Sequence, residues 1–443
     1  MGRLTYPHVA KEIAMRIVRM GLGSFILSIL LAAGVVAAEP DESLFRDLPP
    51  GVFLIDNTII SDSQSDKISQ KLGGNIVRLN NARLTVHGRS IQINIITADT
   101  AGSSERILAT LQRNKLPPFC FRTGKTVIEY VGKDIDEALA RKTSYELRLI
   151  EKPPQITYQV EALLATIDQA DYMACNPLFQ RFLAFNKNQS PETSQQIQQL
   201  AEKFVFGHEL ALRNPSCNAG AATYRLTPAP QQQKSSGAVI RFSFSDLPQQ
   251  VGVPYVTTNI QIVVNHEGVF PTAEVPGKEL TTPTHFWPSD DADIRTLALQ
   301  ITQGKQSNGA KAMAILEWLA PGKNIRYGGQ VGSRWGTAKV LKQRYGHCWD
   351  FSDCFVTLAR AAGVPSRQVG GWLYGASGHV WAEFYREGVG WQQVDPTGGG
   401  KLRCGLYHIP YFTTEDGAMP IVYLAMPKIE IVSDQQPNPI PQR

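Results

Sequence analysis

The chain has 443 residues, of which 43% are hydrophobic and 19% are charged. This is the composition of a soluble globular protein rather than a disordered or fibrous one, and the length predicts two or three domains. The formal net charge is only +5, without clustered basic runs interleaved with aromatic residues, which excludes nucleic acid as an expected partner.

Residues 1–38 have the features of a secretory signal peptide. Four basic residues precede an uncharged, mostly apolar run that ends in the small residues Val36-Ala37-Ala38, a pattern typical of a cleavage site. The alternative is an uncleaved anchor, because the run approaches the ~20 residues that span a bilayer. We expect export to the periplasm or the extracellular space, with membrane association only if the segment stays uncleaved. Cleavage would lower the net charge to +2.

Residues 39–190 are expected to form an N-terminal α/β domain, because strand and helix patterns alternate there. The strands lie near 52–55, 75–86, 90–98 and 126–131, and the helices near 65–72, 103–113 and 134–147. The order β-α-β-β-α-β-α suits a ferredoxin-like sandwich. A further strand is expected at 156–167, before a polar, linker-like stretch at 186–199.

The remainder predicts a small β-rich module at residues 205–285 and a mixed domain at 286–432. Alternating runs near 239–244 and 259–264 indicate strands in the first, whereas helical spacing begins at Asp291 in the second. The tail 433–443 is rich in proline and is expected to be loose.

A helix is predicted to start at or just before Cys348, because apolar residues follow at helical spacing from Phe351 to Ala362. Gly363 and Pro365 end it. Cys348 would therefore lie at a helix N-terminus, where unpaired amides and the helix dipole stabilise a thiolate nucleophile. A lone cysteine in this position is more often buried and inert, so further residues are needed.

Two later segments supply them. Period-2 alternation predicts strands at 378–385 and 390–397, joined by a tight turn into a hairpin. A turn centred on Glu387 would pair residues whose numbers sum to 774, which places His379 opposite Asp395. Asp395 would then orient His379 as the general base for Cys348.

Three blocks in this region resemble the transglutaminase-like superfamily. They read Gly-His-Cys-Trp-Asp-Phe-Ser-Asp around Cys348, Gly-His-Val-Trp-Ala-Glu around His379, and Gly-Trp-Gln-Gln-Val-Asp-Pro-Thr around Asp395. The resemblance covers roughly a third of the chain, from about Asp291 onward. It implies an α+β fold with a papain-like core, and a catalytic triad of Cys348, His379 and Asp395.

Members of this superfamily cross-link or deamidate glutamine side chains, cleave peptide bonds, or have lost activity. The resemblance therefore implies thiol-dependent acyl transfer or hydrolysis on protein or peptide amides, with a non-catalytic exported binding or scaffold protein as the alternative. Trp335 is a further candidate, as a substrate-channel or oxyanion residue.

No cofactor or required metal is expected, since neither CxxC nor HExxH spacing is present. The six cysteines are widely spaced and define no pairing. Cys348 and Cys354 should not form a disulfide, because six helical residues separate them by about 9 Å. The sequence leaves calcium dependence and oligomeric state open.

Overall fold

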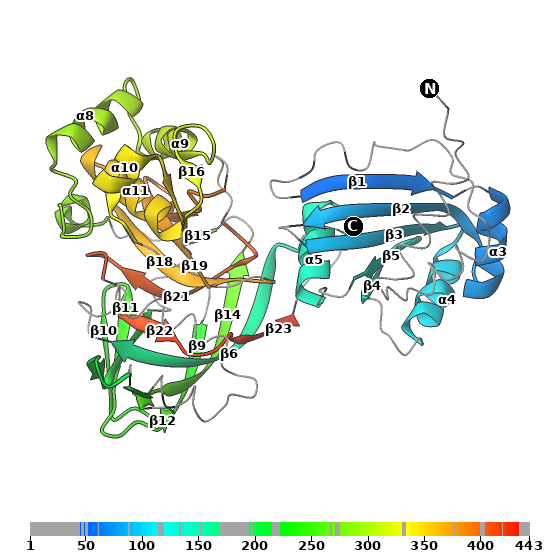
Figure 1. Cartoon of the computed structure of the whole chain (residues 1–443), viewed down its shortest axis with the longest axis horizontal. Helices are drawn as coiled ribbons and strands as arrows, with labels where there is room; N and C mark the ends of the chain where they lie inside the picture. The colour runs from blue at the N-terminus through cyan, green and yellow to red at the C-terminus, as the bar shows by residue number, and fades with distance from the viewer. Residues whose placement is uncertain are drawn as a thin grey trace, which may run out of the picture. The chain divides into compact units, whose positions relative to one another are not determined.

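The structure is a computed structural model of the chain. It describes residues 45–433 with gaps, the longest of which are 114–118, 168–194, 215–221, 271–274, 330–333 and 399–403. The expected signal segment and almost all of the expected loose tail lie outside the described residues. The chain divides into two compact units, Met1–Lys152 and Pro153–Arg443, which are taken in turn (Figure 1).

The first unit is built on a five-stranded antiparallel sheet in the order β1-β2-β3-β5-β4. Apolar residues of two helices, α3 and α4, share a core with one set of strand residues, and α5 shares another core with the alternate set. Both sheet faces are thus covered by helices. In chain order the elements are β1 (Val52–Ile59), α3 (Asp62–Leu72), β2 (Ile76–Val86), β3 (Arg89–Ala98), α4 (Ala101–Gln112), β4 (Phe119–Thr123), β5 (Thr126–Val131) and α5 (Glu137–Glu146).

The ferredoxin-like arrangement expected for this unit is wrong. β1 and β2 flank α3 yet pair directly and antiparallel, whereas a β-α-β crossover would place them parallel. The short, half-exposed β4 was also missed. Strand patterns in a sequence report which residues are buried, but the partner of each strand is decided by contacts distant in the chain.

The boundary between the units falls at residue 152, earlier than the polar stretch at 186–199 indicated. The cause is β6 (Gln155–Ile167), a long strand that pairs with the whole length of β14 (Val256–Asn265) of the β-rich module. The strand expected at 156–167 therefore exists but belongs to the second unit.

The β-rich part contains a three-stranded sheet, β10-β11-β8, a two-stranded sheet, β12-β13, and a larger sheet in the order β22-β6-β14-β9, with β7 and β23 also paired to β6. Its strands within 205–285 are β7 (Phe206–Gly207), β8 (Glu209–Arg213), β9 (Ala222–Thr227), β10 (Gln232–Ser236), β11 (Val239–Ser243), β12 (Gln249–Gln250), β13 (Val253–Pro254), β14 and β15 (Val269–Phe270).

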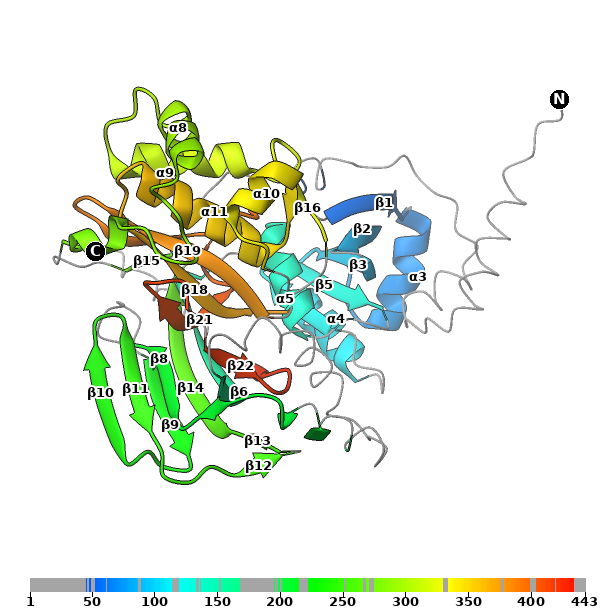
Figure 2. The ribbon, with the colours of Figure 1, turned by 60° about the vertical axis from the view of Figure 1, so that its left-hand side comes forward.

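Two strands from the end of the chain return to pair with β6: β22 (Ile421–Tyr423), labelled beside β6 in Figure 2, and β23 (Lys428–Ser433), labelled beside β6 in Figure 1. The β-rich module and the mixed domain are therefore one interleaved unit, not the two separate domains 205–285 and 286–432 that the sequence indicated.

The mixed part is a five-stranded sheet, β15-β20-β19-β18-β21, covered on one face by α11. Phe351 and Phe355 of α11 share a core with Ala382 and Phe384 of β19 and Val394 of β20. The mixed α+β class is confirmed. The elements are η3 (Lys278–Thr281), α8 (Ala292–Ile301), α9 (Asn308–Leu319), β16 (Arg326–Tyr327), α10 (Thr337–Gln343), β17 (Tyr345–Gly346), α11 (Cys348–Ala361), β18 (Ser366–Leu373), β19 (Gly378–Arg386), β20 (Gly390–Val394) and β21 (His408–Thr414).

A buried ion-pair network joins β8 of the β-rich part to the sheet of the mixed part. Glu383 of β19 is fully buried and accepts hydrogen bonds from Arg213 Nη2 at 2.7 Å and Arg367 Nε at 2.6 Å. Burial alone would raise the pKa of Glu383, but the two guanidinium groups lower it. Removing one partner from such a network leaves an uncompensated buried charge. None of the described helices is long and apolar enough to cross a membrane.

Candidate active site

Cys348 is the first residue of α11, as the helical pattern predicted. The preceding residue, His347, caps the helix with extended backbone, and its N–H donates to Asp350 Oδ2 at 3.0 Å. The other oxygen of Asp350 accepts the backbone N–H of Trp335 at 2.8 Å. The first turn of the helix, and with it the half-buried thiol, is thereby held in a defined position.

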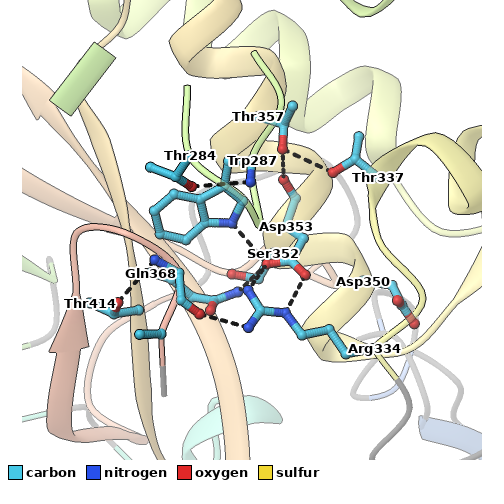
Figure 3. Close-up of polar contacts among 12 residues, drawn as sticks. Thr284, Trp287, Arg334, Thr337, Asp350, Ser352, Asp353, Thr357, Gln368 and Thr414 are labelled. Atoms are coloured by element: carbon cyan, nitrogen blue, oxygen red, sulfur yellow. Dashed lines mark hydrogen bonds and ion pairs between the residues drawn. The ribbon is translucent and has the colours of Figure 1, made fainter. Parts of the chain in front are cut away.

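One turn further along, Asp353 anchors the same helix to three separate segments (Figure 3). Arg334 forms a bidentate ion pair with it, through Nε and Nη2 at 2.6 Å each. Trp287 Nε1 and Gln368 Nε2 also donate to Asp353 Oδ1, at 2.9 and 3.0 Å. Because the carboxylate is almost fully buried and has four donors, the network fixes α11 against β18 and the loops before the helix.

The hairpin of β19 and β20 forms, but its predicted register is wrong. Paired residues sum to 776, as in Glu383 with Gln393, because a three-residue loop follows Arg386. This loop is centred on Gly388 rather than on Glu387, and Gly388 and Gly390 adopt φ values of 72° and 113°, in the region that favours glycine. Since the register differs by two residues, each side chain keeps its predicted face of the sheet.

Asp395 follows the end of β20 and is therefore diagonal to His379 rather than directly opposite it. Diagonal neighbours lie within reach of long side chains, and His379 Nε2 donates to Asp395 Oδ2 at 2.9 Å. The Cys348 side chain lies near the same imidazole and raises its pKa. The structure thus brings together the three side chains that the sequence selected.

The surroundings of the three side chains favour a protonated His379 beside an ionised Asp395. Burial opposes the protonated form of His379, but the charge and hydrogen bond of Asp395, with those of Cys348, raise its pKa to about 10. Burial alone would raise the pKa of Asp395, yet the charges and hydrogen bonds of His379 and His408 hold it well below its usual range. An imidazolium flanked by a carboxylate and a thiol is the consequence.

Asp395 has two further partners that the sequence did not single out. Thr397 donates to Oδ1 through its backbone N–H at 2.9 Å and its hydroxyl at 2.6 Å. His408, from β21, donates through Nε2 to Oδ2 at 3.2 Å. Thr397 stands in the Asp-Pro-Thr block, so its position was visible. His408 is 13 residues beyond Asp395 in an apolar strand, and no local pattern marks it.

Two tyrosines also lie near the thiol without any signal in the sequence. Burial raises the pKa of Tyr327, and the charges of Cys348 and Asp395 raise it further. Burial likewise raises the pKa of Tyr423, partly opposed by the backbone N–H of Gly378 and reinforced by Cys348. Tyr423 comes from β22, so the β-rich part contributes a side chain to the surroundings of Cys348.

Trp335, the candidate oxyanion residue, lies in the loop before α10. Its backbone N–H is engaged by Asp350, and its ring packs edge-on against Tyr345 at 5.1 Å and against Lys339. The indole is half-buried on the helical core. These contacts give Trp335 a packing role, and an oxyanion role stays a prediction.

Within the described residues, one group of side chains brings metal-ligand atoms within 4.8 Å of one another: His379, Asp395 and His408. Both Nε2 atoms are already hydrogen-bonded to one carboxylate oxygen, so an ion here would displace both hydrogens. The thiols of Cys348 and Cys354 are both free, so the two cysteines do not pair with each other. That no metal or cofactor is required stays a prediction.

Residues 295–396 match the family model of the Transglutaminase-like superfamily. The C-terminal part of the chain is a transglutaminase-like domain. The chain is 27% identical over 136 residues to the uncharacterised protein YebA of Bacillus subtilis (strain 168), covering 24% of this chain and 17% of that protein. It is 37% identical over 92 residues to an uncharacterised protein of Haemophilus influenzae, covering 15% of this chain and 24% of that protein.

A solved structure, the periplasmic domain of TgpA from Pseudomonas aeruginosa, is 18% identical, with a TM-score of 0.28; the similarity covers 43% of this chain and 70% of that one. The chain spans less than a quarter of the length of either curated relative. The match to the family model covers residues 295–396 of the chain.

Proposed function

We propose that the transglutaminase-like domain catalyses thiol-dependent acyl transfer or hydrolysis on protein or peptide amides, with Cys348 as nucleophile, His379 as general acid and base, and Asp395 as orienter. The observation that carries the proposal is the placement of His379, which donates a hydrogen bond to Asp395 at 2.9 Å and lies near Cys348, whose side chain raises the pKa of the imidazole. A nucleophile, a base and an oriented carboxylate in this sequence are what covalent amide chemistry needs.

The reaction begins with attack of the Cys348 sulfur on the carbonyl carbon of an amide. The C–N bond then breaks, the departing nitrogen takes a proton from His379, and a thioester to Cys348 remains. Water or a substrate amine attacks the thioester, gives its proton to His379, and releases the thiolate. Water gives hydrolysis or deamidation, whereas an amine gives transfer or cross-linking.

Negative charge on the carbonyl oxygen develops beside the start of α11. The backbone N–H of Cys348 belongs to the first turn of that helix, where amides lack helical acceptors and the dipole favours negative charge. This amide is the donor that the fold offers for an oxyanion, with the Trp335 indole as a second candidate.

The proposed setting is outside the cytoplasm, because residues 1–38 have the pattern of an export signal. The substrates would then be proteins or peptides of the periplasm or cell exterior. No nucleic-acid partner is proposed, and the membrane enters only if the N-terminal segment remains attached.

The proposal is tested by incubating the protein with a mixture of envelope peptides and measuring their masses. Hydrolysis of a peptide bond adds one water, deamidation exchanges an amide for an acid, and cross-linking joins two peptides with loss of ammonia, so the three outcomes are distinct. Cys348→Ala and His379→Ala should each abolish the change.

Cys354→Ala provides the matched control, since it removes a buried thiol from the same helix without touching the site. This variant should retain turnover if it remains folded. Equal mass changes with wild type and Cys348→Ala would refute the assignment. Absence of any change, together with an unreactive Cys348 thiol, would favour the scaffold protein instead.

A further inference from the structure

We propose that His408 is a positioning residue for the triad, which acts by holding Asp395 as an anion against His379. The inference rests on the proposed function of Cys348, His379 and Asp395, and it adds a fourth side chain to their machinery. It is drawn from the hydrogen bond of His408 to the same carboxylate oxygen that receives His379.

The four donors on Asp395 are divided evenly between its oxygens. Thr397 donates twice to Oδ1, and the two imidazoles each donate once to Oδ2. Donors on both oxygens fix the plane of the carboxylate, which a single partner would leave free to rotate. Since Asp395 is only 6% exposed, water cannot replace a lost donor easily.

The hydrogen-bond roles follow from the charge of Asp395. An ionised carboxylate only accepts, so Nε2 of both His379 and His408 must carry the hydrogen. In His379 this leaves the other ring nitrogen for the exchange of a proton with Cys348. His408 therefore supports the tautomer that the mechanism requires, although it does not touch the reacting atoms.

The approach of His408 to the His379–Asp395 pair depends on a glycine in β18, the strand between β21 and β19. β18 separates β21 from β19 in the sheet, and Gly371 of β18 is paired with His379. A Cβ at Gly371 would lie 2.2 Å from Trp381 Cη2. With no side chain there, the buried Trp381 lies edge-on to His408 at 5.0 Å and near-parallel to His379 at 6.0 Å between ring centroids. The indole holds both imidazoles in place.

Other titratable groups face the same site. Tyr327 of β16, Tyr423 of β22 and Cys404 all have pKa values raised above their ordinary values, mainly by burial. None of the three changes charge between pH 4 and 8. These groups therefore do not contribute to the acid side of a pH profile.

Two groups on the side of α11 do need a control. His347 precedes Cys348, with Nε2 hydrogen-bonded to the carbonyl of Gly329 at 2.8 Å. Asp350 accepts the His347 N–H, and burial raises its pKa. His347→Gln, measured in parallel, separates any effect of this histidine from that of His408.

The test measures alkylation of Cys348 by iodoacetamide between pH 4 and 10, with the modified peptide quantified by mass spectrometry. If Asp395 loses the hydrogen bond from His408, it stabilises protonated His379 less well. The Cys348 thiolate that pairs with His379 is then protonated at a higher pH. We expect the half-point of the acid limb to rise by about one pH unit, a tenfold change in the proton affinity, in His408→Phe. His408→Gln keeps an N–H donor near Nε2 and should restore most of the shift.

A second measurement places the effect on Asp395. In an Asp395→Asn background, His408→Phe should add little further shift, because the two side chains act through one hydrogen bond. The proposal would be overturned if folded His408→Phe had the same alkylation half-point as the wild-type protein. Equal shifts from His408→Phe in the wild-type and Asp395→Asn backgrounds would also overturn it. So would a half-point in His408→Gln as high as that in His408→Phe, when the two variants have the same melting temperature.

Failure of the proposed function would look different. Cys348 in the wild-type protein would then react like an ordinary exposed thiol, with a half-point near 8.5, and His379→Ala would not alter it. A low half-point in wild type that depends on His379, but not on His408, refutes the positioning role alone.

Discussion

Replacement of Gly371 by alanine tests how tightly the aromatic cluster behind the triad is packed. The added Cβ would meet Trp381 Cη2 at 2.2 Å and the backbone oxygen of Ile409 at 2.3 Å. Ordinary contacts begin near 3.4 Å, so each neighbour must retreat by about 1 Å. The backbone of Gly371 does not require glycine, because its φ is not positive, and the cost is therefore one of space alone.

Neither neighbour can move easily. Trp381 is fully buried, and Ile409 belongs to a strand paired with β18. Overpacking a well-filled core costs about 1–3 kcal/mol, and the backbone contact places this substitution at the upper end, about 3 kcal/mol. For a unit of this size, that corresponds to a fall in Tm of roughly 6–12 °C.

Urea unfolding and thermal melts measure the loss, and alkylation of Cys348 reports whether displacement of Trp381 disturbs His379. Gly309→Ala is the matched control, since its Cβ would meet only the Arg386 side chain, at 3.8 Å or more, within α9. This control should gain about 0.5–1 kcal/mol, because alanine is the better helix former. A loss below about 0.5 kcal/mol in Gly371→Ala would refute the close packing on which the argument depends.

Four further outcomes are expected. Glu383→Gln should lower the free energy of unfolding by about 3–5 kcal/mol in urea titrations, because the buried guanidiniums of Arg213 and Arg367 both lose the charge of Glu383; a change under about 1 kcal/mol would contradict the network. The stabilisation from protonated His379 should be fully present below its unfolded pKa of 6.5 and be lost as pH rises through about 10, so the Tm difference between wild type and His379→Ala should shrink over that range, and a constant difference would argue against the ion pair. Catalysis should fall over the same alkaline range in rate measurements, since the imidazolium that protonates the leaving amine is lost. Cys354 should stay unmodified in native protein while Cys348 is alkylated, as peptide mass spectrometry can show, because Cys354 is fully buried and burial raises its pKa.

Local patterns in the sequence predict the secondary-structure elements that carry the site. Helical spacing after Cys348 placed it at the start of α11, and period-2 alternation around His379 gave both strands of the hairpin. These patterns are reliable because they reflect which side chains are buried within one element. The faces of His379 and Asp395 were also predictable, since a register error of two residues leaves side-chain direction unchanged.

The remaining features depend on contacts between elements that are distant in the chain. The register depends on the loop after Arg386, which is centred on Gly388 rather than on Glu387. His408 reaches Asp395 from β21, three positions from β20 in the sheet, and Tyr423 arrives on a strand that pairs with β6 far back in the chain. Contacts of this kind join residues that no local pattern connects, because the free energy that selects them comes from burial and hydrogen bonding between whole elements.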